Sequence, residues 1–174
     1  MSAIERHFWH GPDDMNLFVL QSCPSDFRLP QLLTRTVTMF GSLEDIKYVH
    51  DNDMGDFTPE CMDQAVVEGR LDIIKFLHEN REEGCSEHAI IYAAKHNHME
   101  VVKFLVEERN EDRHEARTAF ALEHAVKKGN LEVARYLVEN TSAEIEPHVA
   151  SFAQEEYGLD LLALRNAVVV QHIM

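Results

Sequence analysis

The sequence predicts an all-α fold, a solenoid of stacked helix–turn–helix repeats. Three observations predict it: one core pattern recurs along the chain, glycine and proline are scarce, and the apolar positions within each copy have helical spacing. The chain has 174 residues, with only seven Gly and five Pro to interrupt helices. A unit this small cannot bury its own apolar face, so its stability must come from stacking on neighbouring units.

Four segments of the sequence align without gaps, and a weaker fifth segment lies upstream of them. Their cores begin at Met62, Ile90, Leu122 and Ala150, so the step is 28, then 32, then 28 residues; the weaker core begins at Thr34. We expect a single domain over residues 1–174. Its parts are a degenerate N-terminal cap at 1–29, repeats at about 30–57, 58–85, 86–117 and 118–145, and a C-terminal capping repeat at 146–174.

The first helix of each unit has a start signal, a packing column and a stop signal. Three hydroxyl residues at one offset can cap its N-terminus: Thr58, Ser86 and Thr118. A column of alanines then predicts that two helices approach closely: Ala65, Ala93, Ala125 and Ala153. Residues that tolerate a left-handed backbone follow at the turn: Gly41, Gly69, Asn97 and Gly129.

The second helix of each unit carries apolar residues at offsets 0, 3, 5 and 6, which predicts one buried face. In the last unit this predicts that Leu159 and Leu162 are buried, whereas Arg165 replaces a leucine and indicates a polar outer face. The third unit has four extra residues within Val106–Arg117. Four residues make about one helical turn, so its second helix runs longer or the link loops out.

These features resemble the ankyrin repeat family, whose core reads T-P-L-H-x-A-A-x-x-G-H-x-x-V-V-x-x-L-L. The match is closest over Ala93–Leu105, Ala-Ala-Lys-His-Asn-His-Met-Glu-Val-Val-Lys-Phe-Leu, which departs at Asn97 and Phe104. The 28-residue step is shorter than the family's 33. The resemblance therefore implies an ankyrin-like solenoid of divergent repeats in which the β-hairpin fingers are short or absent.

The resemblance also implies a non-catalytic protein-binding module, because variable residues of the first helices line a concave face in this family. Carried onto this chain, the partner-binding positions are Gln64, Glu68, Tyr92, Lys95, His96, His124, Lys127, Lys128 and Phe152. In the third and fourth units they form an aromatic and basic strip. Such a strip fits an acidic or aromatic-bearing segment of a partner, although lysine and histidine also simply solvate exposed helices.

Composition excludes several other classes of protein. With 16 Lys+Arg against 31 Asp+Glu the net charge is −15, which argues against binding nucleic acid or anionic lipid. No apolar run approaches the length of a membrane span. Without a signal peptide, and with an odd number of cysteines (Cys23, Cys61, Cys85), we expect an intracellular protein, cytoplasmic or nuclear.

No catalytic or metal motif stands out. The eleven histidines lack the paired spacing of zinc sites, and no phosphate loop or nucleophile motif is present, so we expect no enzyme, no metal and no cofactor. Three alternatives stay open: a stacking module of a larger ankyrin assembly, a host-directed effector, and a ubiquitin-ligase adaptor, since Arg28–Leu33 resembles the opening of an F-box. We expect a monomer.

Overall fold

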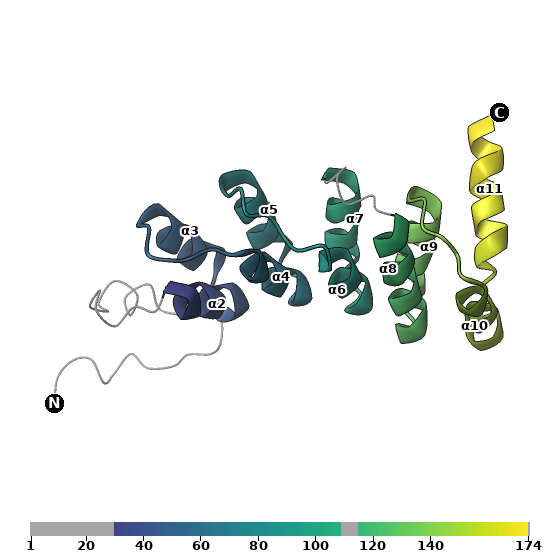
Figure 1. Ribbon diagram of the computed structural model, residues 1–174, viewed down its shortest axis with the longest axis horizontal. Helices are drawn as coiled ribbons and strands as arrows, with labels where there is room; N and C mark the ends of the chain where they lie inside the picture. Colours follow the sequence, from purple (N-terminus) through teal and green to yellow (C-terminus); the bar gives the residue numbers. More distant parts are fainter. Residues whose placement is uncertain (1–29, 109–114, 174) are drawn as a thin grey trace. The chain divides into compact units, whose positions relative to one another are not determined.

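The computed structural model describes residues 30–108 and 115–173, with side chains over 33–107 and 117–170 (Figure 1). The expected N-terminal cap at 1–29 lies outside the described residues, and with it the first two residues of the F-box-like segment, whose remaining four begin α2. Within the described ranges the chain forms ten helices and no strand, which confirms the all-α repeat fold without β-hairpin fingers. The contacts divide the chain into two compact units, each described by itself below. That residues 1–174 form one domain stays a prediction.

The first unit contains four helices. They are α2 (Pro30–Phe40), α3 (Leu43–Asp51), α4 (Pro59–Val67) and α5 (Leu71–Asn80). Helix α2 packs against α3 and α4. Ser42 caps α3 in a complete capping box, in which its Oγ accepts from the Asp45 amide while the Asp45 carboxylate accepts from the Ser42 amide. The Thr34 hydroxyl donates to the Asp56 carbonyl at 2.8 Å and so ties the link after α3 to α2.

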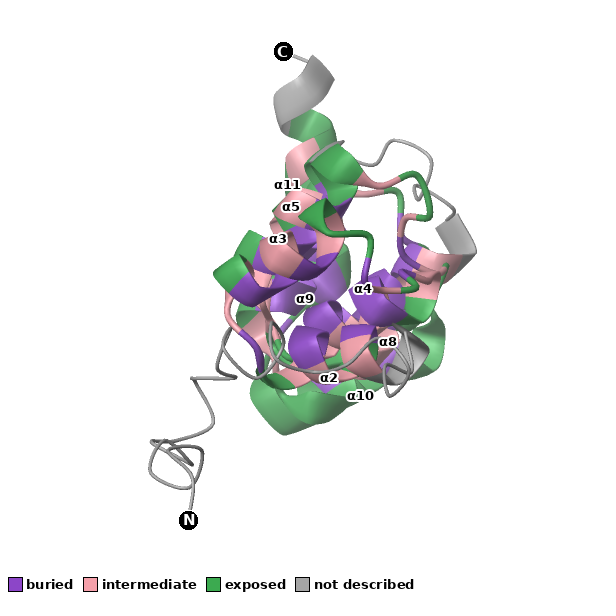
Figure 2. Cartoon of the chain, turned by 90° about the vertical axis from the view of Figure 1, so that its left-hand side faces the viewer, coloured by how far each residue is buried: buried purple, intermediate pink, exposed green. Residues whose placement is uncertain are grey.

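The second unit contains six helices; in Figure 2 its helix α9 is largely buried, whereas α10 is largely exposed. They are α6 (Ala89–Lys95), α7 (Met99–Glu108), α8 (Glu115–Lys128), α9 (Leu131–Asn140), α10 (Pro147–Tyr157) and α11 (Leu161–Ile173). Helix α8 packs against both α6 and α10, and α9 packs against both α7 and α11. Successive helix–turn–helix pairs are therefore stacked, as the repeat pattern predicts.

The alanine column and the turn column are confirmed. Every alanine of the column is fully buried: Ala65, Ala93, Ala125 and Ala153. Gly69, Asn97 and Gly129 have φ values of 69°, 62° and 74°, whereas Gly41 does not have a positive φ. The Asn130 side chain, just past the turn of its repeat, donates to the Ala94 and Lys95 carbonyls at 2.8 and 3.0 Å, so it satisfies the carbonyl end of α6.

Only one of the three expected caps stands at an N-cap position, and its side chain forms no cap hydrogen bond. Thr58 is the N-cap residue of α4 without such a bond, whereas Ser86 accepts from the His88 amide in a turn that precedes α6, and His88 stands at the N-cap position. Thr118 is a buried residue inside α8. The physical reason is that Glu115, Ala116 and Arg117 are good helix formers, so α8 begins before Thr118. The extra residues of this unit thus lengthen the first helix of the next pair.

The last helix pair departs from the aligned register. The alignment puts Tyr157 at the turn, yet α10 runs through Tyr157, and Gly158 takes the left-handed conformation with φ 65°. Helix α11 consequently begins at Leu161, two residues later than aligned. Leu159 is buried as expected, but Leu162 is 53% exposed, and Arg165 turns inward and donates to the Ala143 carbonyl at 2.8 Å. The expected burial of Leu162 and the polar outer face at Arg165 are both wrong.

Candidate binding surface

The predicted strip lies on three neighbouring helices of the second unit. Helix α6 carries Tyr92, Lys95 and, at its C-cap, His96; α8 carries His124, Lys127 and Lys128; α10 carries Phe152. Since α8 packs against α6 and α10, the three groups lie on successive helices of one stack. Four of these side chains are polar and exposed, Lys95, His96, Lys127 and Lys128, and the Phe152 ring is 38% exposed.

Two rings of the strip are held in place by partial burial. Tyr92 and His124 occupy the same position on α6 and α8, and both are half-buried. The Tyr92 ring also meets the His88 ring edge-on, with 6.3 Å between centroids. Rings fixed in this way can contact a partner with little loss of side-chain entropy on binding.

The strip is less basic than its residue types indicate. Lys127 forms an ion pair with Glu123, and the His148 Nε2 atom lies 3.5 Å from the same carboxylate. The hydrogen bond from Lys127 lowers the pKa of Glu123, against the opposing effect of burial, so this carboxylate stays charged. Among the described residues, no ion pair of Lys95 or Lys128 is found. On α10 the corresponding positions are Glu155 and Glu156, so the basic character ends at α8.

The two predicted positions on α4 belong to the first unit. There the Gln64 side-chain amide donates to the Glu68 carboxylate at 3.1 Å across one helical turn. Glu68 is the exposed C-cap of α4 and Gln64 is half-buried. The contact between Gln64 and Glu68 is therefore an interaction within α4. Glu68 adds an acidic group, not a basic one, to the predicted binding positions.

A second row of rings, not predicted from the sequence, lies one turn closer to the start of each first helix. His88 and His148 are exposed, and Phe120 is 54% exposed. Each precedes Tyr92, His124 or Phe152 by four residues, the spacing that places two side chains on one helix face. The sequence does contain a signal for this row, because the three residues share one column of the repeat alignment.

Together the two rows form an aromatic surface on the second unit, named here the ring surface. It is defined by His88, Tyr92, Phe120, His124, His148 and Phe152. Phe152 meets the exposed Tyr157 edge-on at 6.0 Å, which extends the surface along α10. Rings that are exposed or half-buried on three helices packed in one stack are more typical of interaction surfaces than of ordinary solvated helices.

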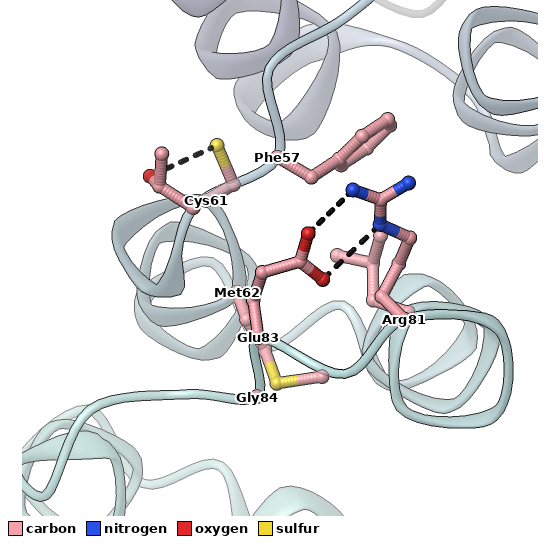
Figure 3. Close-up of a pocket in the computed structure, with 8 residues that line it drawn as sticks. Phe57, Cys61, Met62, Arg81, Glu83 and Gly84 are labelled. Atoms are coloured by element: carbon pink, nitrogen blue, oxygen red, sulfur yellow. Dashed lines mark hydrogen bonds and ion pairs between the residues drawn. The ribbon is translucent and has the colours of Figure 1, made fainter. Parts of the chain in front are cut away.

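The first unit contains a small pocket (Figure 3). Cys61 and Met62 line it, and Arg81 pairs with Glu83 at its edge while stacking on the Phe57 ring at 4.9 Å. Its volume of about 10 Å³ is at the limit needed to hold one water molecule. This pocket is too small for a substrate or cofactor.

In the part of the chain that the structure describes, no group of three or more His, Cys, Asp or Glu side chains could hold a metal ion. Among the same residues, no helix is both long enough and apolar enough to cross a membrane.

Comparison with protein families gives one match, a model of ankyrin repeats in three copies, over residues 38–149. The matched span covers α3 to α9 completely, with parts of α2 and α10. Comparisons with curated proteins and with solved structures gave no significant match.

Proposed function

Because the chain belongs to the ankyrin repeat family, whose members generally bind proteins, we propose that it binds a partner protein through the ring surface and the adjoining lysines of α6 and α8. The observation that supports this proposal most directly is Phe120. A phenyl ring that is 54% exposed leaves much of its apolar surface in solvent, and its helix α8 packs against α6 and α10, which carry the other rings.

The surface favours a partner segment that combines apolar or aromatic side chains with carboxylates. Rings on α6, α8 and α10 supply flat apolar contacts, while Lys95 and Lys128 supply positive charge at the ends of α6 and α8. Tyrosine, phenylalanine and charged groups of this kind often dominate binding energy at interfaces. An acidic partner is repelled by the chain's net charge of −15 as it approaches. Long-range electrostatic attraction therefore does little to speed association, and binding should depend on short-range contacts.

The finer expectations rest on this proposal. Binding without catalysis fits a surface that lacks a deep pocket among the described residues. The roles of effector and of ubiquitin-ligase adaptor gain no support from the described residues, because residues 30–33 of the F-box-like segment are simply the first residues of α2 in the repeat stack. The remaining alternative, association through the end of the stack, is favoured by the large apolar residues that α11 exposes.

The experiment is affinity capture followed by mass spectrometry, with three variants compared to the parent chain. Phe120→Ser/Phe152→Ser removes two exposed rings, and Lys95→Glu/Lys127→Glu reverses the strip's charge. The matched control is Lys47→Glu/Lys103→Glu, which causes the same change in net charge and also breaks intrahelical ion pairs, here with Glu44 and Glu100 on second helices.

We expect the ring variant to weaken capture of the specific partner by about tenfold or more, as the loss of a hot spot does. The strip reversal should weaken it at low salt, while the control leaves it unchanged. Equal loss in the strip reversal and in its charge-matched control would show a nonspecific charge effect. Unchanged capture in the ring variant would refute the proposal.

A further inference from the structure

Helix α11 presents an apolar face that no described residue covers. Its inner side holds Leu161, which is buried, with Leu164, Arg165 and Val168 half-buried. Its outer side exposes three large apolar residues: Leu162 at 53%, Val169 at 50% and Val170 at 55%. Between positions 161 and 170 the only charged residue is Arg165, which turns inward to the Ala143 carbonyl. The outer face of α11 is therefore both apolar and uncharged.

This face continues an interface that already exists within the second unit. Helix α9 packs against α7, α8 and α11, and its residues Val133, Ala134, Leu137 and Val138 are all buried. Helix α11 uses one side against α9 in the same way. Its other side has the composition of a stacking face and lacks the layer that covers the equivalent side of α9.

The exposed residues of α11 are symmetric about Asn166. In an antiparallel pair of identical helices centred on Asn166, Leu162 lies opposite the partner's Val170, and Ala163 lies opposite the partner's Val169. Asn166 is exposed on the same face and meets its own copy at the two-fold axis. Two facing amides can donate and accept hydrogen bonds mutually, and a single buried Asn is a known device for fixing helix register.

Electrostatics favours a second copy of this chain at this face. Two copies of net charge −15 repel each other, and the repulsion between exposed charges decays over about 8 Å at physiological salt. Contact through an uncharged face keeps the acidic groups of the two copies farther apart than contact through a charged helix would. The same lack of charge gives a charged partner no group to recognise.

We propose that a second copy of this chain docks on the outer face of α11, in an antiparallel arrangement with Asn166 at the two-fold axis. The apolar residues of the face become buried, and the stack of each copy continues into the other. The dimer does not depend on the ring surface, which lies on α6, α8 and α10.

Sedimentation velocity and light scattering on the full chain over a range of concentrations test the proposal. The parent should shift from 20.0 kDa towards twice that mass as concentration rises, and more readily at higher salt because screening reduces the repulsion. Val170→Glu places a charge at the contact and should abolish the shift. Phe120→Glu is the matched control, since its side chain is equally exposed and the charge change is the same, and it should dimerise like the parent.

Cysteine cross-linking tests the register separately. Asn166→Cys should form a disulfide-linked dimer under mild oxidation, because the axis brings the two thiols together, while Gln154→Cys, exposed on α10, should not. The parent under the same oxidant accounts for the native cysteines. Circular dichroism checks that each variant retains its helix content.

Three results would overturn the proposal: a parent that stays at 20.0 kDa at every concentration, a Val170→Glu variant that dimerises like the parent, or cross-linking that is equal at positions 154 and 166. A monomeric parent whose capture of another protein is lost in Val170→Glu would assign the face to a different partner. Loss of capture in the Phe120→Ser/Phe152→Ser variant bears on the proposed function alone.

Discussion

Three turn glycines of the second unit share one backbone conformation that strains other residues, but their surroundings differ. Comparing their alanine variants therefore tests the contacts around each turn. Gly69, Gly129 and Gly158 have φ values of 69°, 74° and 65°, a conformation that costs an L-residue about 1–2 kcal/mol. Replacing each by alanine adds the same methyl group in nearly the same conformation. Differences between the three variants therefore report what the new methyl group touches.

The structure predicts a clear order of stability for these variants. At Gly158 a Cβ atom would meet nothing within 4 Å, so Gly158→Ala should cost only the backbone strain, about 1–2 kcal/mol. At Gly69 the Cβ would lie 2.4 Å from the His98 Nδ1 atom and 2.6 Å from its Cε1 atom. Because the ring must move, overpacking adds about 1–3 kcal/mol to the cost of Gly69→Ala.

Gly129→Ala should resemble Gly158→Ala. Its new Cβ would approach the Tyr157 hydroxyl at 3.3 Å, and this hydroxyl is the far end of an exposed side chain that can shift. Asn97 shows the opposite case, since it holds φ 62° without being glycine. Asn97→Gly should stabilise the fold by up to about 1 kcal/mol, because glycine removes the strain.

The assay is urea unfolding followed by circular dichroism, with the free energy of unfolding compared among variants. A double-mutant cycle then isolates the ring contact: His98→Ala should recover part of the loss in Gly69→Ala and none in Gly158→Ala. Equal losses at Gly69 and Gly158, or additive effects of Gly69→Ala and His98→Ala, would show that the turn and the histidine do not touch as described.

Three further predictions concern burial, capping and pH. Ala93→Glu should unfold the array, because it places a charge with no partner at a fully buried site, while Lys95→Glu on the same helix should leave the circular dichroism melting curve unchanged. Ser42→Ala should cost about 1 kcal/mol in urea unfolding, because it breaks a capping box, and a loss near zero would contradict that geometry. The hydrogen bond from Arg81 lowers the pKa of Glu83 below its unfolded value of about 4.5. The charged carboxylate therefore stabilises the fold at pH values above about 4.5, and this stabilisation is lost as the pH falls through the lower pKa of the folded state. Arg81→Gln should flatten that part of the curve of unfolding free energy against pH.

Features that depend on one residue's own backbone or size could be predicted from the sequence. Alanine at one repeat position has no other physical reading than close packing, and all four alanines are fully buried. Left-handed turns at Gly69, Asn97 and Gly129 follow equally from the chemistry of these residue types. These local requirements, repeated at a fixed step, were enough to identify the fold.

Features that depend on competition between neighbouring residues could not be predicted in the same way. Thr118 has the chemistry of a cap, but Glu115 and Ala116 favour helix strongly enough to extend α8 past it. Ion pairing of Lys127 with Glu123 similarly depends on rotamers that the sequence does not specify. The strip was therefore given too much positive charge, and the exposed Phe120 on α8 was overlooked.

The end of the stack shows how a small change in register can create a surface. Tyr157 occupies the aligned turn position, where a left-handed backbone would strain its side chain, so the turn moves to Gly158. The following helix starts later and rotates relative to the alignment, because each residue turns a helix by about 100°. Leu162 consequently leaves the core, and the half-buried Arg165 turns inward to the Ala143 carbonyl. Arg165 would have placed a charge on this outer face, but its guanidinium instead donates to the Ala143 carbonyl. Leu162, which the alignment places in the core, is exposed on the same outer face. An apolar, uncharged face of this kind is stabilised when another apolar face packs against it. We therefore expect the same face of a second copy to bury it.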